Sequence, residues 1–415
     1  MILKPKGCED ILGKESIKRE FINNVIKDLM RVYNYGYIKT PVFEYKELFH
    51  RSVGEGTDIV TKETYDFTDR GGRELTLRPE GTAGVVRSFI ENKMFANPVQ
   101  PVKLYYNDSM YRYERPQSGR QREFYQFGIE TLGSDNEIID AEVISIGAVF
   151  FKLLNLDVVV KINSLGDTKT RENYEEALRN YLKPLINDLC PDCQRRYKEN
   201  ILRILDCKYD QNSKILKEVP HLKDYLSKEA KERYEKVKHF LDLLEVEYVE
   251  DDNLVRGFDY YNHVVFEYHL KNKESLALGG GGRYNHLVED LGGPLTPACG
   301  MAIGLERVSS LLDEIEDEGI DVYVMAISMI EKEYALNLVQ YLRNLGFTVS
   351  MDYLDKNLKN QFKQADRLRS KYLLILNEED LKNDQVNIKD NKTKKEEKVD
   401  RDYIVYYLEE HIKGE

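Results

Sequence analysis

The stretch YRYERPQSGRQREFYQFGIE, residues 111–130, decides the fold. Its two ends have the pattern of β-strands, and the middle, which contains Pro and Gly, predicts the loop that joins them. Alternate residues of a strand face the same way, so Arg112 and Glu114 share a face. Phe124 and Gln126 lie on the returning strand. A guanidinium beside an aromatic ring and a carboxylate suits a nucleotide, although the pattern alone also fits a surface hairpin with incidental charges.

The sequence around this hairpin mixes strands and helices without a regular βαβ repeat. Helical periodicity is present at 16–34 and 137–154, and strand-like stretches occur at 37–43, 75–78, 102–106, 158–162 and 254–268. This mixture predicts an α+β domain over residues 1–320, built on a mixed, mainly antiparallel sheet. Residues from about 167 to 247 are rich in Lys, Glu and Leu and almost without Gly, which predicts a helical insertion.

The last part of the chain, residues 321–415, has a different pattern. Strand-like sequence at 321–327, 347–351 and 372–376 alternates with helical sequence, which predicts a small α/β domain with parallel strands. Lys356, Lys359, Lys363 and Arg367 recur at three- and four-residue steps and are predicted to share one helix face. That face is either simply solvated or able to bind phosphates. The formal net charge of -12 does not exclude a nucleic-acid partner, because phosphate binding needs only a local basic surface.

Composition indicates a folded protein of the cytoplasm. The chain is 41% hydrophobic and 32% charged, so it can bury a sizeable core. We find no signal peptide and expect no membrane span, because the longest apolar region, at 146–162, is interrupted by polar residues.

Three of the five cysteines lie close together in the sequence. Cys190 and Cys193 have the spacing of one zinc knuckle, and Cys207 adds a third thiol. No fourth ligand follows at a normal spacing, and His221 is the nearest histidine. We therefore expect structural thiols and no metal, and no disulfides in a chain without an export signal.

The hairpin closely resembles motif 2 of the class II aminoacyl-tRNA synthetases, specifically the histidyl enzyme. Segment 39–41 resembles motif 1, the dimer element of that class, and 300–307 resembles motif 3. Segments 254–261 and 278–285 are similar to two that are peculiar to histidyl-tRNA synthetases, and 76–82 to their histidine-recognition loop. Residues 321–415 resemble the family's anticodon-binding domain. Six motifs in the family's order imply the class II synthetase fold.

The resemblance implies an ATP site built on the hairpin. By this resemblance, Arg112 grips the α-phosphate of ATP and the histidine carboxylate. Glu114 and Phe124 would hold adenine, and Arg307 would hold the γ-phosphate. Mg²⁺ would enter only as the ion that accompanies ATP.

The resemblance also implies a histidine site. The amino group would be surrounded by Glu80, Gly81, Thr82 and Gln126. An ammonium group donates hydrogen bonds, and the side chains of Glu80, Thr82 and Gln126 can accept them. The imidazole would be bound by Glu130 and Tyr261, with Tyr260 nearby. Polar partners at both ring nitrogens would reject apolar side chains.

Arg256 is the residue to which the resemblance gives the main catalytic role. Attack of a carboxylate on the α-phosphate builds up negative charge, and a fixed guanidinium stabilises it. In the family this arginine takes a place that a metal ion has in other class II enzymes. The structural alternative is an arginine paired with Asp259.

The resemblance thus implies a homodimeric histidine–tRNA ligase that uses ATP, L-histidine and tRNA(His). Two alternatives belong to other functional classes: a regulatory paralogue that binds histidine, and a module that senses uncharged tRNA. The paralogue lacks the motif arginines and the anticodon domain, whereas Arg112, Arg256 and Arg307 and residues 321–415 are present here. The sensing module belongs to a much longer kinase chain.

Overall fold

The computed structural model describes residues 2–53, 62–117, 119–205, 207 and 209–413. The chain divides into two compact units, Met1–Ile315 and Glu316–Glu415. Each unit has a sheet and a hydrophobic core of its own. No helix within the described ranges is long and apolar enough to cross a membrane.

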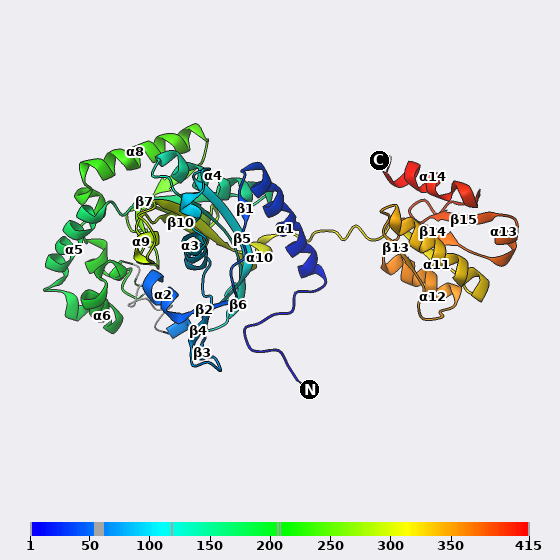
Figure 1. Cartoon of the computed structure of the whole chain (residues 1–415), viewed down its shortest axis with the longest axis horizontal. Helices are drawn as coiled ribbons and strands as arrows, with labels where there is room; N and C mark the ends of the chain where they lie inside the picture. Colours follow the sequence, from blue (N-terminus) through cyan, green and yellow to red (C-terminus); the bar gives the residue numbers. More distant parts are fainter. Residues whose placement is uncertain (1, 54–61, 118, 206, 208, 414–415) are drawn as a thin grey trace. The chain divides into compact units, whose positions relative to one another are not determined.

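The first unit is organised around an eight-stranded sheet (Figure 1). In spatial order the strands are β1 (Gly36–Tyr37), β5 (Val102–Tyr111), β6 (Glu123–Leu132), β11 (Ala298–Gly304), β10 (Lys273–Arg283), β9 (Asn262–Leu270), β7 (Val158–Ser164) and β8 (Tyr248–Glu250). The pairs β1–β5 and β7–β8 at the two edges are parallel, and the others are antiparallel. The prediction of an α+β fold on a mixed, mainly antiparallel sheet is confirmed.

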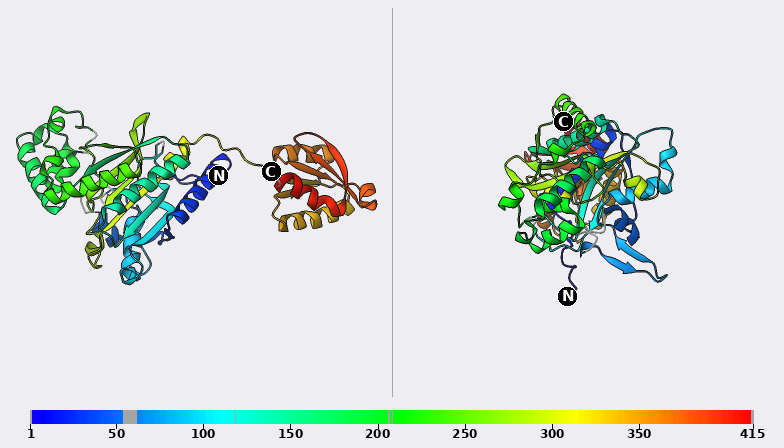
Figure 2. Two further views of the ribbon diagram at one scale, coloured as in Figure 1. Left: turned by 90° about the horizontal axis from the view of Figure 1, so that it is seen from above. Right: turned by 90° about the vertical axis from the view of Figure 1, so that its left-hand side faces the viewer.

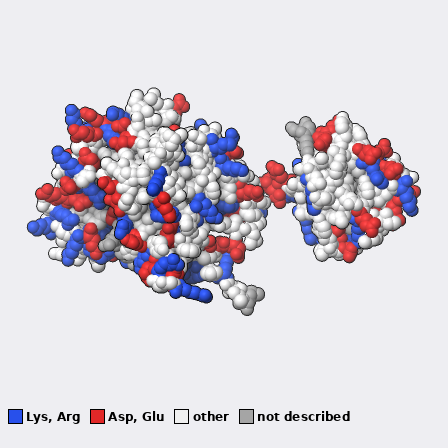
Figure 3. Space-filling model, in the orientation of Figure 1, with Lys and Arg blue, Asp and Glu red and all other residues white. Residues whose placement is uncertain are grey.

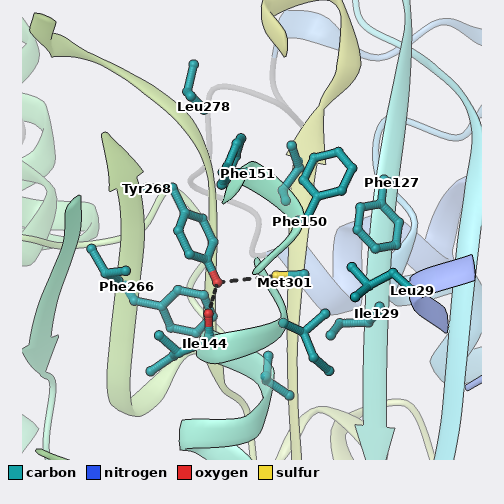
Figure 4. Packing of buried hydrophobic residues seen from close by; sticks show 14 of the residues in the cluster. Leu29, Phe127, Ile129, Ile144, Phe150, Phe151, Phe266, Tyr268, Leu278 and Met301 are labelled. Atoms are coloured by element: carbon teal, nitrogen blue, oxygen red, sulfur yellow. Dashed lines mark hydrogen bonds between the residues drawn. The ribbon is translucent and has the colours of Figure 1, made fainter. Parts of the chain in front are cut away.

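One face of this sheet packs against four helices around the main core. They are α1 (Lys14–Val32), α4 (Glu137–Leu153), α8 (Lys228–Leu243) and α10 (Leu305–Leu311). Figure 4 shows Tyr268 among the phenylalanines of this core, where its hydroxyl donates to the Ile144 carbonyl oxygen at 2.8 Å. Because side chains alternate along a strand, Phe127 and Ile129 of β6 point into this core and Glu130 points to the opposite face.

The opposite face of the sheet carries α3 (Thr82–Glu91) and α9 (Leu287–Asp290), which bury a second hydrophobic cluster against the sheet. A small sheet in the order β2 (Phe43–Tyr45), β4 (Glu74–Leu77) and β3 (Asp66–Thr68) precedes α3 in the chain, and α2 (Lys46–Val53) follows β2. A short 3-10 helix, Met94–Ala96, follows α3.

A helical segment, coloured green in Figure 2, connects β7 to β8. It has a small hydrophobic core of its own. It contains α5 (Thr168–Leu182), α6 (Pro191–Glu199), α7 (Lys214–Lys217) and α8, with 3-10 turns at Ile186–Asp188, Ile201–Ile204 and Leu222–Tyr225. The side chains of Asp167, Ser213 and Ser227 accept a backbone N–H at the start of α5, α7 and α8. Such N-caps fix where these polar, lysine-rich helices begin.

The second unit has a five-stranded sheet in the order β13 (Val349–Met351), β12 (Val322–Met325), β14 (Tyr372–Ile375), β15 (Gln385–Asp390) and β16 (Glu396–Asp400). The first three strands are parallel, and β15 and β16 are added as an antiparallel hairpin. Its helices are α11 (Met329–Asn344), α12 (Leu358–Arg367), α13 (Glu378–Lys382) and α14 (Ile404–Leu408), with turns at Arg401–Tyr403 and Glu409–Lys413. The predicted α/β domain is confirmed, with a mixed sheet in place of a purely parallel one.

Candidate active site

A cavity of about 400 Å³ opens on the face of the large sheet opposite the main core. Strands β6, β10 and β11 contribute its lining, and glycines leave room for it. A Cβ atom at Gly300 would lie 1.8 Å from Oε2 of Glu130, and one at Gly280 would lie 2.9 Å from Nη1 of Arg256. These two positions therefore have to be glycine for the carboxylate and the guanidinium to occupy their places.

The structure brings most of the predicted site residues together around this cavity. Ten of them line it directly: Glu80, Thr82, Arg112, Glu114, Phe124, Gln126, Arg256, Tyr260, Tyr261 and Arg307. Glu130 is buried behind the residues that line the cavity. It accepts a hydrogen bond from the hydroxyl of Thr82 at 2.7 Å. Gly81 lies directly against Tyr106. A Cβ atom at this position would be 2.3 Å from the Tyr106 ring, so a larger residue would not fit.

Two buried carboxylates face each other at the start of α3. Glu80 accepts the backbone N–H groups of Thr82 and Ala83, both at 2.7 Å. Glu130 accepts the hydroxyls of Thr82 and Tyr284. Burial raises the pKa of Glu80, and burial together with the nearby charge of Glu80 raises the pKa of Glu130 to about 8. A cationic or hydrogen-donating ligand would offset the free-energy cost of burying these two carboxylates.

Gln126 adds an acceptor to the same group. Its Oε1 atom is buried and has no hydrogen-bond partner among the described residues. A buried polar atom without a partner is costly, so this oxygen is suited to a donor that a ligand brings. Tyr260 and Tyr261 lie beside it with ring centroids 4.6 Å apart, and burial raises the pKa of Tyr261 to about 12.

Arg112 lies between these acceptors and the hairpin. It follows the last residue of β5, and its Nε donates to the Pro79 carbonyl at 2.9 Å. Its guanidinium lies 5.1 Å from the centre of the Phe124 ring, and its Nη1 is 3.8 Å from Glu114. The side chain is thus held at its base while its outer nitrogens face the cavity's charged groups.

Arg307 lines the cavity close to two other arginines, Arg112 and Arg120. Its Nε donates to the Gly119 carbonyl at 3.3 Å, and its Nη1 donates to the Ala277 carbonyl. Burial and the neighbouring charges of Arg120 and Arg112 lower the pKa of this guanidinium. Like charges collected around one cavity favour a polyanionic ligand.

Arg256 forms an ion pair with Glu267 of β9. Although burial opposes ionisation, Arg256 and His269 lower the pKa of Glu267, so the pair is charged. Nε of Arg256 is buried without a hydrogen-bond partner in the described part of the chain. The alternative pairing with Asp259 is not what the structure has, because Asp259 accepts from Asn200 at 2.6 Å instead.

Sequence reasoning missed several residues of this site. Glu267, Arg120 and Tyr284 were not predicted, and each contacts or neighbours a residue that was. Arg120 could have been found from the sequence, because it lies in the loop of the hairpin 111–130, which was expected to bind the nucleotide. For Tyr284 there was also a signal, because it lies in segment 278–285. For Glu267 there was none, since only the fold brings β9 to Arg256.

Comparisons with known proteins cover both units. Residues 7–308 match the family model described as histidyl-tRNA synthetase, and residues 321–411 match the one described as anticodon binding domain. The histidine–tRNA ligases of Bacillus licheniformis and Bacillus subtilis are 47% and 46% identical to this chain, over 97% and 99% of both sequences. The crystal structure of apo histidyl-tRNA synthetase from Staphylococcus aureus has a TM-score of 0.84 at 39% identity and covers 98% of this chain and 100% of that one.

Proposed function

The chain belongs to the histidyl-tRNA synthetase family and has its histidine–tRNA ligase activity, and we propose how the pocket of the first unit performs the two steps. In the first, a carboxylate oxygen of L-histidine bonds to the α-phosphorus of ATP, and the bond to pyrophosphate breaks. In the second, a hydroxyl of the terminal ribose of tRNA(His) attacks the carbonyl carbon, and AMP leaves. One observation carries the proposal: a single cavity combines buried acceptors with four arginines and an aromatic ring.

The arginines and Phe124 are assigned to ATP. Phe124 would stack on adenine, with Glu114 accepting from its amino group. Arg307 would hold the γ-phosphate, since Arg120 and Arg112 already concentrate positive charge around it. Arg112 would bridge the α-phosphate and the histidine carboxylate, which suits its place between the two groups of side chains.

The acceptors are assigned to histidine. Glu80, Thr82 and Gln126 would receive the three hydrogens of the α-ammonium, and the partnerless Oε1 of Gln126 supports this. Gly81 would keep the backbone of this loop close to the ligand. Glu130 and Tyr261 would bind the imidazole nitrogens, with Tyr260 packed against the ring of Tyr261. A substrate without ring nitrogens would make no hydrogen bond to the buried polar groups of Glu130 and Tyr261, and such a loss discriminates by several powers of ten.

Arg256 is assigned to the α-phosphate. Its ion pair with Glu267 fixes the guanidinium before the substrate arrives, so little reorganisation is needed when charge develops on the pentavalent phosphorus. The free Nε donor of Arg256 gives it a second point of contact.

Mg²⁺ is proposed to accompany ATP. This ion prefers oxygen ligands and is usually held by phosphates, waters and one or two carboxylates. The pocket fits it, because Glu267 presents a carboxylate to the cavity. When bound, Mg²⁺ would neutralise part of the triphosphate charge.

The second unit is proposed to bind the anticodon arm of tRNA(His). Lys359, Lys363 and Arg367 are exposed on α12 at four-residue steps and would contact phosphates. Lys356 does not belong to this face, because it precedes the helix and its amine bonds to Gln364. On the face of the molecule drawn in Figure 3, basic and acidic side chains are interspersed, so the proposal rests on this local row and not on net charge.

We further propose that the enzyme acts as a homodimer in the cytoplasm, where ATP and tRNA are available. Exposed aromatic side chains gather on the small sheet after the segment that resembles motif 1: Phe43 is 54% exposed, Tyr45 55% and Phe67 40%. The rings of Phe43 and Phe67 pack edge to face at 6.2 Å. A cluster of this kind at the surface is typical of a protein interface.

The test of the proposed chemistry is histidine-dependent exchange of labelled pyrophosphate into ATP, followed by charging of tRNA(His). Exchange should require L-histidine and should not occur with phenylalanine, which lacks the ring nitrogens. Exchange without histidine, or with phenylalanine at the same rate, would contradict the assignment of Glu130 and Tyr261.

A further inference from the structure

The helical segment between β7 and β8 contains a cluster of four metal-binding side chains away from the ATP and histidine pocket. They are Cys190, Cys193, Cys207 and Asp210, whose ligand atoms all lie within 4.8 Å of one another. Cys193 and Cys207 are buried, and the other two are half-buried. The sequence suggested three thiols without a fourth ligand, and the fold supplies Asp210 as that ligand.

Two of the distances between these atoms match those of ligands around one tetrahedral ion. Zinc lies about 2.3 Å from thiolate sulfur and about 2.0 Å from a carboxylate oxygen, so tetrahedral ligands are about 3.8 Å apart for two sulfurs and about 3.5 Å apart for sulfur and oxygen. The sulfurs of Cys190 and Cys207 are 3.6 Å apart. The Cys207 sulfur is 3.5 Å from Oδ2 of Asp210. All three cysteines are free thiols.

The local structure holds the ligands in this arrangement. Cys190 immediately precedes α6, Pro191 begins that helix, and Cys193 lies in its first turn. The backbone N–H of Cys190 donates to Oδ2 of Asp210 at 3.0 Å, which ties the two halves of the cluster together. The Asp210 carboxylate thus lies among the three cysteine thiols. A carboxylate and three thiols gathered at one point form a set of ligands that a divalent cation such as Zn²⁺ would complete.

We propose that Cys190, Cys193, Cys207 and Asp210 bind one Zn²⁺ ion as a structural site. The four protein ligands close the coordination sphere, which separates structural zinc from catalytic zinc. Each thiol gives up its proton as its sulfur bonds to the ion, so binding releases up to three protons and affinity rises with pH.

The ion would stabilise a segment that supports the active-site loop. Between Cys193 and Cys207, the side-chain amide of Asn200 donates to Oδ1 of Asp259 at 2.6 Å, and Arg203 donates to the Gly257 carbonyl. Both contacts are made to the neighbouring loop just after Arg256. A bound ion at the base of the segment would therefore hold Asn200 and Arg203 in place.

The experiment measures metal content and coordination in the full-length enzyme. Protein purified under reducing conditions without added metal is expected to contain one zinc per chain by elemental analysis. After removal of the zinc by a chelator, titration with Co²⁺ alone should give the visible absorption of a tetrahedral, thiolate-ligated ion. Cys207→Ser should lose the metal, and Asp210→Asn should bind Zn²⁺ about tenfold or more weakly. Cys8→Ser, which removes a thiol from the N-terminal segment, is the matched control and should keep one zinc and the wild-type cobalt spectrum.

Three results would overturn the proposal. The first is a reduced wild-type enzyme that, with its circular dichroism unchanged, takes up neither Zn²⁺ nor Co²⁺ at stoichiometric amounts. The second is a Cys207→Ser enzyme that binds zinc as tightly as the wild type. The third is mass spectrometry showing a Cys190–Cys207 disulfide in place of the metal in enzyme purified under reducing conditions.

Discussion

Glu130 is a buried carboxyl whose pKa of about 8 lies well above its ordinary value of 4.5. The folded enzyme therefore keeps its proton up to about pH 8, whereas the unfolded chain loses it near 4.5. This group's contribution to stability is full below pH 4.5 and is lost as the pH rises through about 8. Glu130→Gln should accordingly show a smaller fall in melting temperature between pH 5 and pH 8.5 than the wild type. Differential scanning calorimetry across that range measures it.

The matched control for this prediction is Glu91→Gln. Glu91 is an exposed carboxylate on α3 that pairs with Arg87. Its replacement should leave the pH dependence of melting as in the wild type. If Glu130→Gln and Glu91→Gln melt with the same pH dependence, Glu130 is ionised in the free enzyme and its assignment as a buried neutral group is wrong.

The same scale shows where sequence reasoning works and where it stops. Arg256 could be found from its motif, but its partner could not. Asp259, three residues away, was the natural candidate from sequence, and the fold instead provides Glu267 from β9. Asp210 was missed although it lies only three residues after Cys207, because a lone aspartate in a charged sequence does not mark a ligand and only the fold shows its carboxylate beside the thiols. Partners such as Glu267 of β9 are set by tertiary packing, which periodicity does not reveal.

At the scale of elements, α12 tests the link between the second unit and tRNA. The double change Lys363→Ala and Arg367→Ala should weaken tRNA(His) binding and reduce the salt dependence of log K by about one unit for each lost phosphate contact. Filter binding or fluorescence titration at several salt concentrations gives both quantities. The double change Lys392→Ala and Lys394→Ala removes the same charge from the loop between β15 and β16 and is the control. An unchanged salt slope in the α12 variant would mean that this face is only solvated.

Element boundaries were the less predictable part of the fold. Strands β5, β6, β7 and β9 of the large sheet and the alternation in the second unit followed from residue pattern, because buried strands and amphipathic helices have distinct periods. Strand β8 and the glycine-rich strand β10 were not predicted. Lys356 was placed on the basic helix, yet α12 begins at Leu358, since the side chain of Asn357 caps it by accepting from Asn360. The polar residues 385–400 form β15 and β16 and extend the sheet.

At the scale of the whole molecule, the dimer proposal predicts an association that depends on the aromatic cluster of the small sheet. Phe43→Ser together with Phe67→Ser should shift the enzyme from dimer toward monomer at micromolar concentration. Both rings are largely exposed in the single chain, so their loss should change the melting temperature of the monomer little. Sedimentation velocity measures the state. A wild-type enzyme that is monomeric at this concentration with full activity would contradict the proposal.

The role of Arg256 in forming the adenylate is the central claim for the whole enzyme. Arg256→Ala should lower the turnover of histidine-dependent pyrophosphate exchange on the order of a hundred- to a thousandfold, with a smaller change in the KM for ATP, because the guanidinium acts mainly where charge develops. Arg256→Lys keeps the charge but loses the geometry for two parallel hydrogen bonds. Its turnover in pyrophosphate exchange should lie between those of the wild type and Arg256→Ala.

The most direct measurement compares the two steps on one folded Arg256→Ala protein. Pyrophosphate exchange reports adenylate formation, and single-turnover transfer from preformed histidyl-adenylate to tRNA(His) reports the second step. The account predicts a large loss in exchange and a much smaller loss in transfer, since the phosphate is only a leaving group in the second step. An unchanged exchange rate, or equal losses in both steps, would contradict it.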